Sequence, residues 1–139
     1  MKKTIALLLT AVATIFLLSS CNSSEVIVIT DRLFITQLHD ISQERNHYMG
    51  RTIQIEGRNH FVDFSGNDLY FIVRYTRGCC GEQNLTGFQV YFDDHPIPDN
   101  GAWVRVVGTL EICDVTPHGL RLRVTSLRNI SPGQDWVEN

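Results

Sequence analysis

Five short segments in which apolar and polar residues alternate constrain this chain more than any other feature. They cover residues 52–56, 69–75, 88–92, 103–110 and 121–127. A period of two places every second side chain on one face of a strand, so each segment predicts a half-buried β-strand. Turn-forming residues gather between the segments, as in Asp99-Asn100-Gly101. Five short strands at this spacing favour a small barrel or a sandwich, and an OB-like five-stranded barrel is the first choice.

The residues before these strands predict two further elements. Val26-Ile27-Val28-Ile29 is a β-branched run that is typical of a strand. Asp31 stands where a helix cap is expected, ahead of apolar residues at Phe34 and Leu38, so a short helix follows. Gly57 is predicted to end the strand over 52–56. Glycines 57 and 108 also suit places where a barrel strand coils or bulges tightly.

The first twenty residues have the architecture of an export signal. A basic start at Lys2 and Lys3 is followed by an almost entirely apolar run. Leu18-Ser19-Ser20-Cys21 then resembles a bacterial lipobox. That resemblance implies cleavage before Cys21 and acylation of its sulfur and amino group, which holds a protein stably on a membrane. The alternative is an ordinary secretory signal with a cysteine at its end by chance.

This segment sets the predicted division of the chain. We expect a signal peptide over 1–20, a lipidated cysteine with a tether and first strand over 21–30, and an OB-like barrel over 31–130. Residues 131–139 are predicted to be a loose tail. The expected location is the extracytoplasmic face of the cell membrane or the outer membrane, with the lipid on Cys21 as the membrane contact.

The charge of the mature chain argues against a nucleic-acid partner. Lys2 and Lys3 are the only lysines of the sequence, so the chain from Cys21 onward has ten arginines against fifteen acidic residues. Affinity for phosphates depends largely on positive charge. We therefore predict that nucleic acid is not a ligand.

Three stretches, taken in order, carry a family resemblance. The first is Phe34-Ile35-x-x-Leu38-x-Asp40-Ile41 followed by Tyr48-x-Gly50-Arg51-x-Ile53-x-x-Glu56-Gly57, the second is Phe71-x-Val73-Arg74-Tyr75 leading to Cys79-Cys80, and the third is Trp103-Val104-x-Val106-x-Gly108-Thr109-Leu110. Together they resemble the extracytoplasmic OB-like domain at the C-terminus of a bacterial family of two-component permease subunits, the YcgQ type, over residues 33–127. The resemblance implies an OB-like fold outside the cytoplasmic membrane.

Two departures from the family pattern bear on function. The family usually follows its paired cysteines with small residues and an aspartate, whereas Gly81-Glu82-Gln83-Asn84 stands here. The transmembrane helices of the family are also missing from this sequence. A lipid on Cys21 would replace them as the anchor, so any permease activity would belong to a partner.

Three cysteines remain once Cys21 is lipidated, and an odd number in an exported protein calls for an explanation. Cys113 could form a disulfide with Cys79 or Cys80. Cys79, Cys80 and Cys113 could instead bind zinc or copper(I), with His118 as the favoured fourth ligand. The third alternative is a disulfide between the adjacent cysteines, and the fourth is a set of buried, inert thiols. The sequence leaves all four open.

The sequence contains no recognisable catalytic motif, so we do not expect an enzyme. The first functional hypothesis is a lipid-anchored accessory module of a permease that binds metal through its cysteines. The alternative is a protein- or glycan-binding module of the cell envelope whose cysteines are structural. OB barrels use faces of arginine and aromatic side chains for ligands, and such a face is predicted here from Arg105, Arg121, Arg123 and Arg128 with Phe88 or Tyr91. The simpler alternative is that these arginines only provide the polar outer face that barrel strands need.

Overall fold

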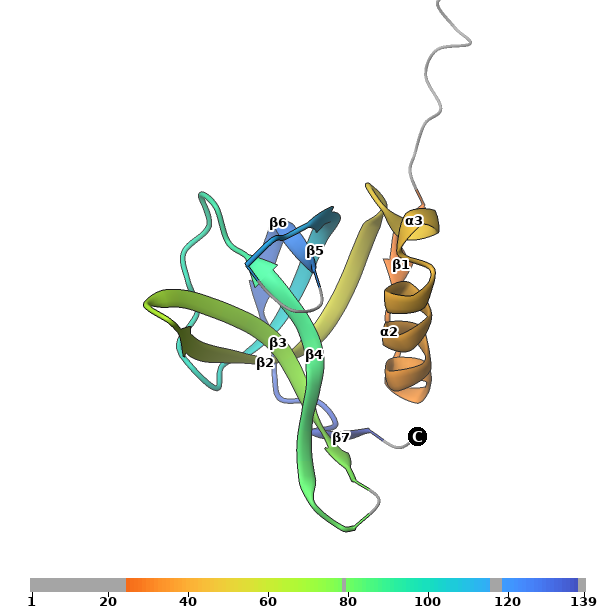
Figure 1. Ribbon diagram of the computed structural model, residues 1–139. Coiled ribbons are helices and arrows are strands. Elements are labelled where there is room, and N and C mark those ends of the chain that lie inside the picture. The colour runs from red at the N-terminus through yellow and green to blue at the C-terminus, as the bar shows by residue number, and fades with distance from the viewer. Residues whose placement is uncertain (1–24, 79, 116–118, 138–139) are drawn as a thin grey trace, which may run out of the picture.

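Five strands form a closed ring at the centre of the molecule (Figure 1). The computed structural model describes residues 25–78, 80–115 and 119–137. Around the ring the order is β2-β5-β6-β4-β3 and back to β2; β4 and β6 pair in parallel, and the other neighbours are antiparallel. This arrangement confirms the predicted mainly β, OB-like fold. The strands are β2 (Thr52–Phe64), β3 (Asn67–Arg77), β4 (Gln83–Tyr91), β5 (Trp103–Ile112) and β6 (Leu120–Asn129).

Two glycines allow the ring to coil. The prediction that Gly57 ends a strand is wrong, because β2 continues past it for a total length of 13 residues. Gly57 lies where β2 leaves β5 and joins β3, and a Cβ there would lie 2.6 Å from the carbonyl oxygen of Val73. The β5–β6 register shifts between Val107 and Gly108, as expected for a bulge at Gly108.

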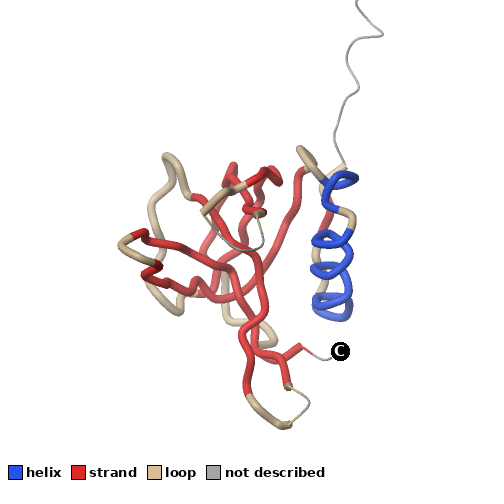
Figure 2. Tube along the Cα trace, viewed as in Figure 1, coloured by secondary structure: helices blue, strands red, loops and turns tan. Residues whose placement is uncertain are grey.

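One hydrophobic core joins the ring to helix α2 (Phe34–Gln43). The helix contributes Phe34, Leu38 and Ile41, each at most 6% exposed. Figure 2 shows α2 standing beside the barrel. The helix predicted after Asp31 is therefore confirmed. From the strands, the core receives side chains that include Ile53, Ile55, Ile72, Phe88, Val90, Val104, Val106, Leu110, Leu120, Leu122 and Val124.

Three small elements complete the N-terminal part: β1 (Ile27–Val28), the 3₁₀ helix η1 (Asp31–Leu33) and α3 (Arg45–Tyr48). β1 pairs in parallel with β2, and the side-chain amide of Gln37 in α2 donates to the carbonyl of Val28 at 3.1 Å. These contacts fix the start of α2 against the barrel. Within the described residues, no helix has the length and apolar character needed to cross a membrane.

The C-terminal residues are not the loose tail that the sequence predicts. Trp136–Val137 forms strand β7, which pairs in parallel with β3, and Val137 is 2% exposed. Asp135 accepts two hydrogen bonds of 2.7 Å from the guanidinium of Arg58. These bonds from Arg58 lower the pKa of Asp135. The turn-forming residues of this segment suggested a tail, but Trp136, Val137 and the Asp135–Arg58 ion pair hold it against the barrel.

Candidate binding groove

A cavity lies between α2 and β4, two elements that contact each other. It has a volume of about 480 Å³, which falls within the range of small-ligand sites. We call it the α2–β4 groove. Its lining consists of Ile35, Leu38, His39, Ser42, Gln43, Phe71, Leu85, Thr86, Gly87, Phe88, Gln89 and Leu120.

One face of α2 forms the first wall of the groove. Ile35, His39 and Ser42 recur at the spacing of one helix face, and Leu38 and Gln43 flank them. Leu38 also belongs to the core, so the groove wall and the core face of α2 meet along the same helix. The position of this wall therefore depends on how firmly α2 packs on the barrel.

Arg74 packs against the start of α2. Its guanidinium lies 5.0 Å from the ring centroid of Phe34 in α2 and 5.3 Å from that of Trp103 in β5. The Nε of Arg74 donates to the carbonyl of Glu56 at 2.8 Å, and Nη1 forms an ion pair with Asp31. The side chain is 2% exposed, so a buried cation in β3 joins η1, α2, β2 and β5 at the base of the helix.

One edge of β4 forms the second wall. Five consecutive residues, Leu85–Gln89, line the groove, although successive side chains of a strand point to opposite faces. Residues whose side chains point to opposite faces of a strand can line one cavity only where the cavity runs along the edge of that strand. Leu85 is 46% exposed and Gly87 is also exposed, so this edge is accessible.

The groove lining contains two hydroxyl groups, two side-chain amides and one imidazole. The two hydroxyl groups in the lining are held by structural hydrogen bonds: Ser42 donates to the carbonyl of Leu38 at 2.9 Å, and Thr86 bonds the hydroxyl of Thr76 at 3.0 Å. None of the described lining side chains is an aspartate, glutamate, lysine or arginine. The groove therefore offers apolar surface together with hydroxyl, amide and imidazole groups.

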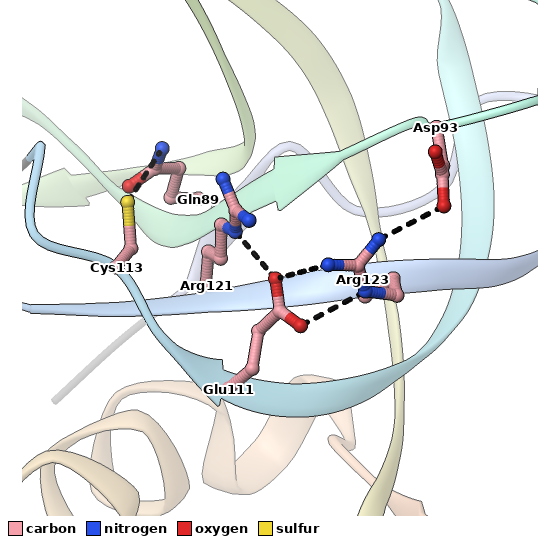
Figure 3. Close-up of polar contacts among 6 residues, drawn as sticks. All are labelled: Gln89, Asp93, Glu111, Cys113, Arg121 and Arg123. Atoms are coloured by element: carbon pink, nitrogen blue, oxygen red, sulfur yellow. Dashed lines mark hydrogen bonds and ion pairs between the residues drawn. The ribbon is translucent and has the colours of Figure 1, made fainter.

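Gln89 connects the groove to Cys113 (Figure 3). The amide Nε2 of Gln89 lies 3.8 Å from Sγ of Cys113, which accepts a weak hydrogen bond. Cys113 is 4% exposed and carries a free thiol. The sulfur packs behind the groove as a small buried group.

The structure does not bring Cys80 and Cys113 together. Cys80 lies in the turn between β3 and β4, before Gln83, whereas Cys113 contacts Gln89. Six residues of strand separate Gln83 from Gln89, or about 20 Å along β4. The predicted Cys80–Cys113 disulfide is not formed in this structure, because Cys113 is a free thiol.

The same separation bears on the predicted metal site. Within the described residues, no group of three or more histidine, cysteine, aspartate or glutamate side chains could hold a metal ion. Cys79 and His118, like the predicted lipidation site Cys21, lie outside the described residues. Their part in a zinc or copper(I) site stays a prediction, but a site that includes both Cys80 and Cys113 would require β4 to be rearranged.

A network of charges lies beside Cys113 on the outer face of β5 and β6 (Figure 3). Glu111 accepts hydrogen bonds from Arg121 at 2.6 Å and from Arg123 at 2.9 Å, and Arg123 also donates to Asp93. Burial alone would raise the pKa of Glu111, but the two arginines outweigh it and the pKa is lowered. Both arginines also lie over the ring of Tyr91, at 4.4 and 5.3 Å. Acidic partners thus compensate these positive charges.

Sequence reasoning did not find the α2–β4 groove. Its residues belong to four distant segments, and none of these segments forms a recognisable motif. The sequence signal is indirect. The predicted strand covers residues 88–92, whereas β4 already begins at Gln83, so the uncovered part of its edge lies before the predicted strand.

Comparisons with known proteins identify the family of this domain. The family model described as the DUF1980 C-terminal domain matches residues 13–137. No curated protein matches the chain. Among solved structures, a dimeric structure of the N-terminal domain of PriB protein from Thermoanaerobacter tencongensis is 11% identical, with a TM-score of 0.31. The alignment covers 58% of this chain and 97% of that one. The family match confirms the relationship to the YcgQ type, and the chain belongs to the family of the DUF1980 C-terminal domain.

Proposed function

We propose that this protein is a non-enzymatic binding module of the bacterial cell envelope that holds a segment of a partner protein in the α2–β4 groove. The observation that carries the proposal is the groove itself: about 480 Å³ between a helix face and the edge of a strand, with a largely apolar lining. Such a lining takes up apolar side chains and gives orientation through a few polar groups. This is the protein-binding form of the hypothesis drawn from the sequence.

The sequence adds a location to this proposal. The lipobox-like end of the first twenty residues supports a lipid on Cys21, and the family relationship supports a role beside a permease in the membrane. We therefore propose that the partner is a membrane or envelope protein on the extracytoplasmic side. Metal binding is not required for this role.

A peptide selection on the full-length, detergent-solubilised protein tests the groove. A random dodecapeptide library displayed on phage is panned against the protein, and enriched peptides are synthesised. Their affinities are then measured by fluorescence anisotropy for the wild type and for two variants. Gln43→Trp places a large side chain in the groove lining, whereas Glu44→Trp is the control at the neighbouring exposed position, which lies outside the lining.

The expected result is selective loss of binding. Gln43→Trp should weaken the peptides about tenfold or more, which corresponds to ~1.4 kcal/mol, and Glu44→Trp should leave affinity within about twofold. Circular dichroism confirms that both variants are folded. The proposal fails if no peptide is enriched, or if Gln43→Trp binds the enriched peptides as well as the wild type does.

A further inference from the structure

We propose that the segment bound in the α2–β4 groove is an extended strand that adds to the open edge of β4. This inference rests on the proposed function and specifies how the partner is recognised. Strand addition requires backbone N–H and C=O groups that point outward, together with space beside them for a second backbone. β4 meets both requirements along the groove.

The hydrogen bonds of β3 determine which groups of β4 point outward. The N–H of Tyr75 donates to the carbonyl of Asp135 at 2.9 Å, on the β7 side of β3 and therefore away from β4. Opposite residues of an antiparallel pair either exchange both backbone bonds or exchange neither. Tyr75 lies opposite Leu85. Leu85 therefore directs its own N–H and C=O away from β3 and toward the groove.

Strand β2 gives the same result independently for Gly87. The N–H of Asn59 donates to the carbonyl of Ala102 at 2.9 Å, on the β5 side of β2. The preceding residue, Arg58, therefore directs its backbone groups toward β3, where it lies opposite Val73. Val73 bonds β2 rather than β4, and it lies opposite Gly87. Gly87 thus also presents its N–H and C=O to the open edge.

The open edge continues an existing ladder. β6 pairs with β4 at Val90 and Tyr91, and in the described part of the chain no strand pairs with Leu85–Gly87 on that side. A strand in the groove would lie where β6 would lie if it began earlier. It would therefore extend the β4–β6 pairing along a surface that already has the geometry of a sheet.

The lining defines the chemistry of the added segment. Ile35, Leu38 and Phe88 offer apolar contacts, and none of the described lining residues carries an acidic, lysine or arginine side chain. A charged side chain buried here would lose its hydration without gaining a counter-charge. Alternate side chains of a strand point the same way. The expected segment is an uncharged extended peptide with apolar residues at every second position.

Backbone methylation of the selected peptides tests strand addition. Each peptide amide is replaced in turn by its N-methyl form, which removes one donor, and affinity for the full-length protein is measured. Strand addition predicts losses of about tenfold or more at every second amide and smaller losses between them. If no amide is sensitive while Gln43→Trp still weakens binding, the groove proposal stands and strand addition is wrong.

A matched pair of variants tests the protein side. Leu85→Pro removes an N–H that points to the groove, at an edge position where proline is tolerated, whereas Leu85→Ala keeps it. We expect the proline variant to bind about tenfold more weakly than the alanine variant. In the wild type, bound peptide should slow hydrogen exchange at Leu85 and Gly87, while the amide of Thr86, which points to β3, is slow in both states.

Two results would overturn the inference. The first is equal peptide affinity of folded Leu85→Pro and Leu85→Ala. The second is exchange at Leu85 and Gly87 that does not change when the peptide saturates the wild-type protein. Because the exchange measurement uses the unaltered protein, it decides the question even if Leu85→Pro fails to fold.

Discussion

Replacing Arg74 by lysine should destabilise the protein far more than the same change at an exposed arginine. Arg74 is 2% exposed and reaches the carbonyl of Glu56 and the carboxylate of Asp31 with two different nitrogens. A lysine keeps the charge but offers a single nitrogen on a flexible chain, so it cannot reproduce this fork. One of the two acceptors therefore loses its partner.

The magnitude follows from these contacts. A lost hydrogen bond to a charged group costs about 1.5–3 kcal/mol. Weaker contact with the rings of Phe34 and Trp103 adds about 0.5–1 kcal/mol. We expect Arg74→Lys to lower the free energy of unfolding by about 2–4 kcal/mol. For a domain of this size that corresponds to a decrease in Tm of roughly 8–16 °C.

Urea and thermal unfolding followed by circular dichroism measure this loss. Arg105→Lys is the matched control, because Arg105 is 42% exposed and pairs with the side chain of the same residue, Glu56, at 2.6 Å. An exposed pair contributes about 0–1 kcal/mol, so this variant should resemble the wild type. The reasoning is refuted if Arg74→Lys lies within about 0.5 kcal/mol of the wild type, or if the two variants lose equal stability.

Four further outcomes are expected. Gly57→Ala should cost about 1–3 kcal/mol in urea unfolding, because its Cβ would lie 2.6 Å from the carbonyl oxygen of Val73; wild-type stability would contradict the close approach. The pKa of Asp135 is lowered by Arg58, so the ionised Asp135 stabilises the fold above about pH 4, and this contribution is lost as pH falls through the folded-state pKa. Asp135→Asn should therefore flatten that part of the curve of unfolding free energy against pH. Native mass spectrometry after zinc is offered to the reduced protein should give the same metal content for wild type and Cys113→Ser, since the thiol of Cys113 is buried away from the β3–β4 turn; a lower content in the variant would restore Cys113 as a ligand. Cys21→Ala should move the protein from the membrane fraction to the soluble fraction, and an unchanged distribution would contradict lipid anchoring.

Local patterns in the sequence predicted the elements but not their lengths. The alternation at Ile53 and Ile55 identified β2, and the spacing of Phe34 and Leu38 identified α2, because both patterns reflect one buried face. The extension of β2 beyond Gly57 could not be inferred, since it depends on a change of partner from β5 to β3. In the sequence Gly57 is typical of a strand end, whereas in the barrel it allows β2 and β3 to approach each other closely.

The candidate site was less predictable than the fold. Cysteines attracted functional hypotheses because of their chemistry, yet Cys80 and Cys113 lie toward different ends of β4. Which residues meet in space depends on the strand order around the ring, and no spacing along the chain contains that information. The groove could not be predicted for the same reason, because the exposure of Leu85 depends on where β6 begins, more than thirty residues later.

The α2–β4 groove results from closing a barrel with a helix. β6 begins at Leu120 and accompanies only the last part of β4, so the edge near Leu85 has no strand beside it in the described structure. α2 covers the gap with side chains such as Leu38, which buries apolar surface. It cannot pair with β4, because the backbone groups of a helix bond within the helix. An open edge is usually a hazard for uncontrolled association. Here α2 stands opposite the edge and leaves a bounded space, so the same packing that leaves β4 unpaired also favours a single extended chain as its partner.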